Sequence, residues 1–303
     1  MRPPRLLPFA LALLAPLASL AGCGGDDGGT TTAGTAGGGA SGSTGTGTGT
    51  GAGGPAGIHD HLLISEVMLT PEQGEYIELW NPTDAEIDLE TYYLSDNSAY
   101  VGIAKGEPWA PFGSEGSDFL ARFAPGTRIR AGEVLVIATN PDFEFAHGRC
   151  ADLGLHAMPV HCGGDTTPSL IAPENGALGT QEGLLTNGGE MLVLFSWSGT
   201  VGEPVKDVDY IVWGDVTKLG DSEAADKSAE MGYQADTPLA QQRPALPPPA
   251  NQSLERCSLE IGEKTSGGNG ITGDDETSEQ LDQSFKVAMT PSPGEMNACF
   301  SAP

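Results

Sequence analysis

The fold is decided by the stretch LLISEVMLTPEQGEYIELWNP, residues 62–82. Its first part, residues 62–69, is a short apolar run that ends at Thr70-Pro71. Its second part, residues 75–80, alternates polar with apolar side chains and breaks at Asn81-Pro82. Short apolar or alternating runs that are bounded by turn residues predict strands. We therefore expect two strands here, separated by a turn.

The same pattern continues along the chain. Residues 92–96, 191–197 and 205–213 are further strand candidates, and residues 127–138 predict a hairpin with its turn at Ala131-Gly132. Strands at this spacing, separated by Gly, Pro and Asn turns, are typical of an antiparallel β-sandwich. Residues 141–186 and 214–252 lack a regular pattern, and we interpret them as an insertion and a wrapping loop.

Ordered motifs in this part of the chain resemble the lamin tail domain family. Ile-Ser-Glu-Val at 64–67 is followed by Glu-Tyr-Ile-Glu-Leu-Trp-Asn at 75–81, and then by Ile-Asp-Leu and an aromatic strand within 87–96. Segments near 126–137, 187–194 and 253–297 extend the resemblance over most of the chain after residue 58. The resemblance implies an all-β, immunoglobulin-like sandwich with long loop insertions and a binding or adhesive role, and it implies no reaction.

The N-terminus has the pattern of a lipoprotein signal peptide. Arg2 and Arg5 precede an apolar run at residues 6–20, which is shorter than the roughly 20 residues that a membrane span needs. Leu20-Ala21-Gly22-Cys23 resembles a bacterial lipobox, which implies cleavage after residue 22 and lipidation of Cys23. An ordinary secretory peptide with a chance cysteine is the alternative. We predict a lipid-anchored protein of the cell envelope, and Gly24 after the anchor favours the outer membrane over the inner membrane.

Composition divides the chain into three parts. Residues 1–22 are the predicted signal peptide, residues 23–57 combine the lipidated cysteine with a Gly/Thr/Ser-rich linker, and residues 58–303 form the predicted sandwich with an insertion at about 141–186. The linker cannot bury enough apolar surface to fold. We expect a flexible tether with a reach of roughly 30–35 Å.

The chain is strongly acidic. It has 14 Lys+Arg against 41 Asp+Glu, a formal net charge of −27. Such a surface repels nucleic acid phosphates, so we expect no nucleic acid partner. The predicted partners are the membrane, through the lipid anchor, and an unidentified protein or glycan of the envelope. The charge is also compatible with divalent cation binding.

Four cysteines follow Cys23, and an exported protein meets an oxidising compartment. They allow three disulfide pairings, of which Cys150–Cys162 with Cys257–Cys299 is the most local. We predict that local pairing. The first of these disulfides would pin the insertion at about 141–186.

The loop around Cys150 and Cys162 also contains His147, His156 and His161. Histidine nitrogen and cysteine thiolate suit zinc, so a zinc site is an alternative to the disulfide. We favour the disulfide because oxidation removes two of the ligands.

An acidic loop at residues 273–279 offers carboxylates from Asp274, Asp275, Glu276 and Glu279. Calcium prefers several oxygen ligands on a flexible loop, although this spacing differs from that of an EF-hand. A solvated turn is the alternative that we favour. We therefore predict no cofactor, and calcium at this loop and zinc at the loop around Cys150 are the alternatives left open.

No catalytic motif can be read from the sequence, which lacks a Gly-x-Ser-x-Gly elbow and a phosphate loop. We interpret Glu66 and Glu78 in the family motif as residues with a strand-edge hydrogen bond or a surface role, not as an acid–base pair. A non-catalytic module is thus predicted. A hydrolase would instead require a pocket that contains several of Glu66, Asp96, His156 and Asp209.

Overall fold

The computed structural model describes residues 53–109, 116–156, 167–180, 184–215, 219, 225, 227 and 230–300. The chain divides into two units, Met1–Ser43 and Thr44–Pro303, and all described residues belong to the second unit. The predicted signal peptide, Cys23 and most of the linker lie outside the described residues and stay predictions. Among the described residues, no helix has both the length and the apolar character that a membrane crossing requires.

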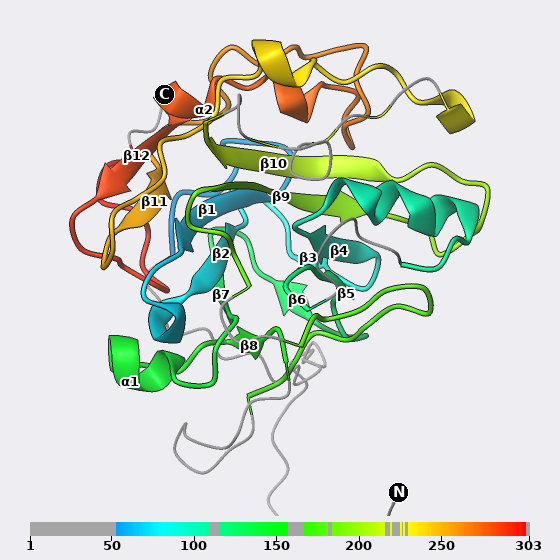
Figure 1. The fold of residues 1–303 in the computed structure, drawn as a ribbon. Helices are drawn as coiled ribbons and strands as arrows, with labels where there is room; N and C mark the ends of the chain where they lie inside the picture. Colours follow the sequence, from blue (N-terminus) through cyan, green and yellow to red (C-terminus); the bar gives the residue numbers. More distant parts are fainter. Residues whose placement is uncertain are drawn as a thin grey trace, which may run out of the picture. The chain divides into compact units, whose positions relative to one another are not determined.

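The larger sheet has the two strands of the opening stretch at its centre. β1 (Leu63–Met68) pairs antiparallel with β2 (Tyr76–Trp80) on one side and with β11 (Ser253–Arg256) on the other. The strand order is β12-β11-β1-β2-β7-β8 (Figure 1). The remaining strands are β7 (Val134–Ala138), β12 (Phe285–Ala288) and β8 (Leu153–Gly154), of which β12 and β8 form the edges and β8 runs parallel to β7.

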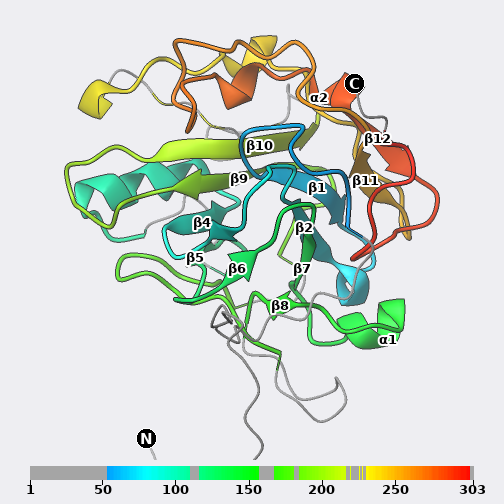
Figure 2. The ribbon, with the colours of Figure 1, turned by 180° about the vertical axis from the view of Figure 1, so that it is seen from behind.

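The second sheet is antiparallel and has the order β10-β9-β4-β5. Its strands are β10 (Lys206–Gly214), β9 (Gly189–Ser196), β4 (Tyr92–Ser95) and β5 (Leu120–Arg122). A separate ladder joins β3 (Ile87–Asp88) to β6 (Arg128–Ile129). Figure 2 shows the same strands from behind. The all-β, immunoglobulin-like sandwich that the sequence predicts is confirmed.

The hairpin predicted for residues 127–138 is wrong in its pairing. Both segments form strands, but β6 pairs with β3 and β7 pairs with β2. All five residues of β7 are buried, so this strand lies within the larger sheet. Arg128 of β6 is exposed. It forms ion pairs with Asp88 of β3 and with Glu86, which directly precedes β3. Burial and charge pairing, which are tertiary effects, therefore override adjacency in the chain.

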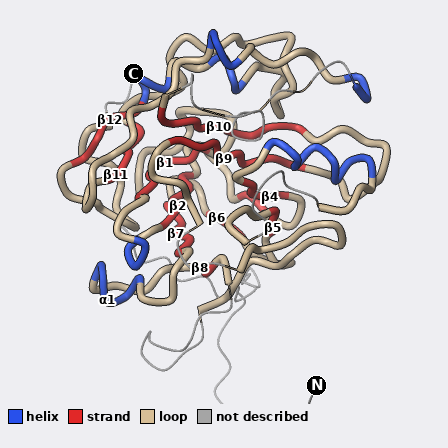
Figure 3. The backbone as a smooth tube through the Cα atoms, in the orientation of Figure 1, coloured by secondary structure: helices blue, strands red, loops and turns tan. Residues whose placement is uncertain are grey.

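Helices are short and occur in the connections between strands (Figure 3). The predicted insertion at about 141–186 contains one of them and also β8, so part of it joins the larger sheet. Residues 157–166 and 181–183 of this insertion lie outside the described residues. The helices are α1 (Phe143–His147), α2 (Leu281–Ser284) and the 3-10 helices η1 (Glu72–Gly74), η2 (Ser98–Lys105), η3 (Glu230–Gly232), η4 (Leu239–Gln241) and η5 (Glu276–Ser278).

The main core lies between the two sheets. Ile77 and Leu79 of β2 are fully buried in it, together with apolar residues from every strand of the second sheet. The opposite face of β2 is covered as well, since Tyr76 packs on α1 and Trp80 packs on the C-terminal segment. Each buried Å² of apolar surface stabilises the fold by about 25 cal/mol. Burial on both faces explains why β2 carries one charged residue, Glu78.

Glu78 lies opposite Glu66 on β1, and we call these two residues the strand pair. Both side chains are fully buried. Glu66 accepts hydrogen bonds from Ser253 Oγ (2.5 Å) and from the backbone N–H of Ser292 (3.1 Å). Glu78 accepts hydrogen bonds from Ser65 Oγ (2.7 Å) and from the backbone N–H of Gly294 (2.6 Å). The strand pair thereby holds residues 292–294, which we call the closing segment, against the larger sheet.

Cys257, directly after β11, forms a disulfide with Cys299, as predicted. This bond joins the larger sheet to the C-terminal segment, next to the closing segment held by the strand pair. Cys162 lies outside the described residues, so the predicted Cys150–Cys162 pairing stays a prediction.

Candidate metal centre

A pocket of about 650 Å³ lies where the start of the domain meets the segment after β11. Carboxylate and imidazole side chains, which are the common ligands of divalent metals, make up half of its lining. The residues that line it are Gly57, Ile58, His59, Asp60, Leu259, Glu260, Glu263, Thr265, Thr272 and Asp274. Segments distant in sequence meet here because β1 and β11 are neighbours in the sheet.

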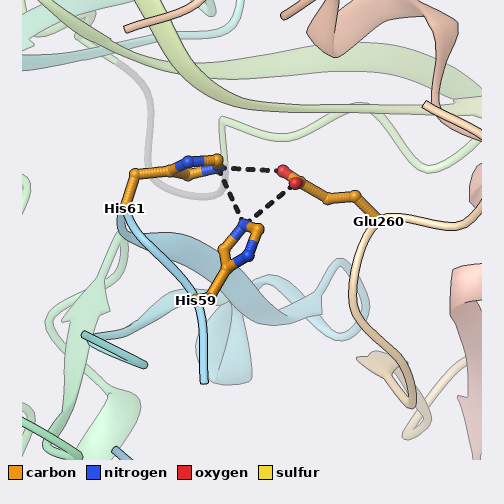
Figure 4. A group of neighbouring side chains, drawn as sticks. All are labelled: His59, His61 and Glu260. Carbon is orange, nitrogen blue, oxygen red and sulfur yellow. Dashed lines mark hydrogen bonds and ion pairs between the residues drawn. The ribbon is translucent and has the colours of Figure 1, made fainter. Parts of the chain in front are cut away.

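Two histidines and a glutamate converge in this pocket, and we call them the histidine triad (His59, His61 and Glu260). His59 Nε2 lies 2.9 Å from one carboxylate oxygen of Glu260, and His61 Nε2 lies 3.0 Å from the other. The two Nε2 atoms are 3.2 Å apart. Figure 4 shows the three side chains pointing toward a common centre.

Neighbouring carboxylates determine the charge of the histidine triad. His61 Nδ1 lies 2.9 Å from Asp60 Oδ1, and the His61 side chain is only 2% exposed. Burial by itself lowers the pKa of His61, but the hydrogen bond and the charge of Glu260 raise this pKa to about 9. Burial also opposes ionisation of Glu260, yet hydrogen bonds from His59 and His61 hold the pKa of its carboxyl well below the ordinary value. Without a metal, the triad is therefore an ion pair.

A second group, which we call the pocket carboxylates, consists of Glu263, Asp274 and Glu276. One oxygen from each lies within 4.8 Å of the others, and Asp209, Glu260 and Glu276 form an adjoining group with the same spacing. Glu263 Oε1, Asp274 Oδ1 and Glu276 Oε1 are buried and have no hydrogen-bond partner in the described part of the chain. Buried polar atoms are nearly always partnered, so three unpartnered oxygens in one place point to a ligand.

A glycine loop brings the pocket carboxylates together. Gly270 pairs with Asp207 of β10, and a Cβ atom on Gly270 would lie 1.8 Å from Asp274 Oδ1 and 2.9 Å from Glu276 Oε1. A Cβ atom on Gly268 would lie 1.8 Å from the backbone oxygen of Asp274. Gly268 has backbone at this distance and therefore has to be glycine, whereas a Cβ atom on Gly270 would displace the side chains of Asp274 and Glu276. The loop sequence GGNG thus permits the close approach.

In the described part of the chain, positive charge only partly balances the pocket carboxylates. Arg256 lies 2.9 Å from Asp209 and 2.8 Å from Glu279, so its charge is shared between those two acids. Burial and repulsion from Glu260 raise the pKa of Glu263 to about 10, and burial and the same repulsion raise the pKa of Glu276 well above its ordinary value. Carboxylates in this state require either bound protons or a bound cation.

The structure separates the four residues of the predicted acidic loop. Asp274 and Glu276 belong to the pocket carboxylates. Asp275 instead accepts hydrogen bonds from threonine and lysine side chains of neighbouring loops, and Glu279 pairs with Arg256. A purely solvated turn, the interpretation that we favoured from sequence, is wrong, because Asp274, Asp275, Glu276 and Glu279 are all buried.

The zinc alternative around Cys150 is only partly visible, since His161 and Cys162 lie outside the described residues. His147 Nε2 lies 2.8 Å from the backbone oxygen of Gly74, and its ring packs on Tyr76. His147 is therefore placed by contacts with the protein itself.

The residues that a hydrolase site would have required do not gather in the pocket. Asp209 adjoins the pocket carboxylates, whereas Glu66 belongs to the strand pair. Asp96 forms a separate buried group with Asp118 and Glu190, in which Asp96 Oδ1 accepts a hydrogen bond from the backbone N–H of Phe119. None of Glu66, Asp96 and His156 lines the pocket described above.

Sequence reasoning missed the histidine triad and Glu263. A usable signal was present in His59-Asp60-His61, because alternate residues of an extended chain point to the same side. Glu260 carries no such signal, since its contact with the histidines depends on strand pairing. No local pattern marks Glu263 either, which meets Asp274 and Glu276 in the folded chain.

The fold and the pocket define an immunoglobulin-like β-sandwich with a cluster of carboxylate and imidazole side chains. The family model for the lamin tail domain matches residues 58–215, so the chain belongs to the lamin tail domain family. His59, His61 and Asp209 lie within the matched residues. The other acids of the pocket, Glu260 and the pocket carboxylates, lie beyond them.

Comparison with solved structures finds a crystal structure of a DUF4876 family protein from Bacteroides thetaiotaomicron. The two chains are 11% identical with a TM-score of 0.39, over 77% of this chain and 72% of that chain. No curated protein matches the chain.

Proposed function

We propose that this protein is an exported lipoprotein whose lamin tail domain is a non-catalytic binding module of the cell envelope, stabilised by a calcium ion in its pocket. The observation that carries the calcium proposal is the set of unpartnered, buried oxygens on Glu263, Asp274 and Glu276. The partner would be a protein or glycan of the envelope, because the net charge of −27 disfavours nucleic acid.

Calcium fits the pocket carboxylates better than other common cations do. Calcium takes six to eight oxygen ligands and tolerates irregular geometry, whereas magnesium demands a regular octahedron and keeps several waters. The pocket carboxylates supply only oxygen, and Glu260 and Asp209 adjoin them. Thr265 and Thr272 also line the pocket and offer hydroxyl oxygens.

The proposed position of the domain rests on the N-terminal sequence. Lipidation of Cys23 would attach the chain to the membrane, with the outer membrane favoured by Gly24. Two or three acyl chains give stable anchoring, since each buried methylene contributes about 0.8 kcal/mol. Residues 23–57 would then hold the sandwich away from the bilayer as a flexible tether.

Calcium titration of the purified protein tests the metal part of the proposal. We expect calorimetry to show saturable calcium binding in the wild type and its loss in Glu276→Gln, which keeps the size of the side chain and removes its charge. Asp282→Asn is a matched control, because Asp282 pairs with Arg243 at the surface. Equal calcium binding by the wild type and Glu276→Gln would reject the site.

Membrane fractionation tests the anchor. We expect the wild type in the membrane fraction and Cys23→Ser in the soluble periplasmic or extracellular fraction, with the signal peptide unprocessed or processed elsewhere. Retention of Cys23→Ser in membranes with an unchanged mass would reject lipidation at this residue.

A further inference from the structure

We propose that the histidine triad is a separate binding site for a transition-metal ion of the zinc class. His59, His61 and Glu260 would supply two nitrogen ligands and one carboxylate. Its two nitrogen ligands take no part in the proposed calcium site, and of the triad only Glu260 adjoins the pocket carboxylates, so either proposal can fail without the other.

The distances within the triad fit a tetrahedral metal site. Zn–N bonds of about 2.0–2.1 Å place two ligand atoms about 3.3 Å apart along a tetrahedral edge. The Nε2 atoms of His59 and His61 are 3.2 Å apart, and they lie 2.9 Å and 3.0 Å from the two oxygens of Glu260. The separation of the two nitrogens is close to this edge, and the two N–O separations are about 0.3–0.4 Å shorter, so a small outward shift of the three side chains would admit a metal ion (Figure 4).

Asp60 orients one of the ligands. His61 Nδ1 lies 2.9 Å from Asp60 Oδ1, so this nitrogen donates to the carboxylate and directs Nε2 toward the triad. Metal-binding histidines commonly have such a carboxylate partner on the second nitrogen, which selects the tautomer that binds the metal. Asp60 would therefore be a positioning residue.

Strand register brings Glu260 to the histidines. β1 and β11 are antiparallel with Glu66 opposite Glu255, Val67 opposite Leu254 and Met68 opposite Ser253. His61 lies two residues before β1 and Glu260 lies four residues after β11, so the antiparallel pairing of these strands brings the two segments to the same end of the sheet. The Cys257–Cys299 disulfide holds the segment that carries Glu260. The site is therefore supported by the sheet and not by a loop alone.

The ligand types favour zinc-class metals over calcium. Imidazole suits Zn²⁺, Co²⁺ and related ions, whereas calcium prefers oxygen. Three protein ligands are one fewer than zinc usually takes, and His59 and Glu260 both line the pocket. Water or a ligand in the pocket would complete the coordination.

Cobalt titration of the purified full chain tests the proposal, because tetrahedral Co²⁺ absorbs strongly in visible light. We expect a single Co²⁺ to bind with this absorption and to be displaced by Zn²⁺. His59→Gln should abolish the absorption, and Asp60→Asn should weaken binding by roughly 10–100-fold. His147→Gln is the matched control, since His147 bonds to a backbone oxygen outside the pocket.

His61 is almost fully buried, so His61→Gln could unfold the chain, and His59→Gln therefore carries the test. A circular dichroism spectrum and a melting curve like those of the wild type confirm that His59→Gln is folded. Cobalt absorption that is absent in the wild type, or that persists in His59→Gln, would overturn the proposal. Glu276→Gln should lose calcium and keep cobalt, which separates this site from the proposed calcium site.

Discussion

Two groups of buried carboxylates in this protein differ in how their oxygens are partnered. The strand pair, Glu66 and Glu78, accepts hydrogen bonds from serine hydroxyls and from backbone N–H groups of the closing segment. Each of the pocket carboxylates has an oxygen that receives no hydrogen bond from any described residue. Both groups are largely removed from water, and in the described part of the chain the oxygens of the strand pair all have hydrogen-bond partners, whereas one oxygen of each pocket carboxylate has none.

The difference separates a structural role from a binding role. A buried carboxylate that is fully hydrogen-bonded fixes the segments that donate to it. A buried carboxylate with an unpartnered oxygen carries a desolvation penalty that a cation can offset. The same residue type therefore closes the domain in one region and offers a ligand site in the other.

The largest expected effect comes from Arg256, which lies on β11 between the two groups. Its guanidinium pairs with Asp209 and Glu279, and all three side chains are at most 1% exposed. Arg256→Met would leave two buried acids without their cation, so we expect the free energy of unfolding to fall by about 3–5 kcal/mol. Urea denaturation measures this. Arg243→Met, which breaks an exposed pair, should change stability far less.

Removal of the strand pair should destabilise the fold regardless of calcium. Glu78→Ala leaves Ser65 Oγ and the N–H of Gly294 without their acceptor. Each buried donor without an acceptor costs about 1–3 kcal/mol, so we expect a loss of about 2–4 kcal/mol in total. The loss should be the same in calcium and in EDTA. A loss that appears only in calcium would remove the distinction between the two groups.

Calcium should stabilise the wild type through the pocket carboxylates. At a calcium concentration about 100 times the Kd, linkage predicts an increase of about 2.7 kcal/mol in the free energy of unfolding. The increase should disappear in Glu276→Gln and persist in Glu174→Gln, a control at an exposed site. Thermal or urea denaturation with calcium and with EDTA measures both variants.

In EDTA, stability should fall as the pH rises from 6 to 8. Burial raises the pKa of Asp209 to about 7 and that of Glu263 to about 10, so the folded state holds protons that the unfolded state has released. A group whose pKa rises from about 4 to about 7 on folding loses about 1–2 kcal/mol of stabilisation across this interval. Calcium should reduce the slope, because the cation replaces the protons. An equal slope in calcium would argue against binding at these acids.

The smallest effect is expected at the exposed ion pairs of β3 and β6. Arg128 pairs with Glu86 and Asp88, and its side chain is 50% exposed. Solvent screens such pairs, so Arg128→Ala should cost less than about 1 kcal/mol. Its calcium response should equal that of the wild type, which makes it a baseline for the buried acids.

Local pattern was enough to predict a large part of the fold. Alternation and apolar runs predicted the strands at residues 62–80, 92–96, 191–197 and 205–213, because a strand that is buried on one or both faces imposes that pattern on its own residues. The hairpin at residues 127–138 failed because strand pairing depends on which neighbours bury each face. The sequence indicated the acidic loop as a calcium candidate. It did not indicate that Asp274 joins the pocket carboxylates while Asp275 pairs with threonine and lysine side chains.

The sequence by itself determined the sandwich class and the family motifs, and it favoured the pairing of Cys257 with Cys299 among three alternatives, since each depends on spacing along the chain or on residue type. Only the tertiary structure decided the metal-binding pocket. His61 and Glu260 are 199 residues apart, and they meet because β1 and β11 pair in one particular register. Contacts of this kind depend on how strands assemble in space, and no local pattern in either segment encodes the partner.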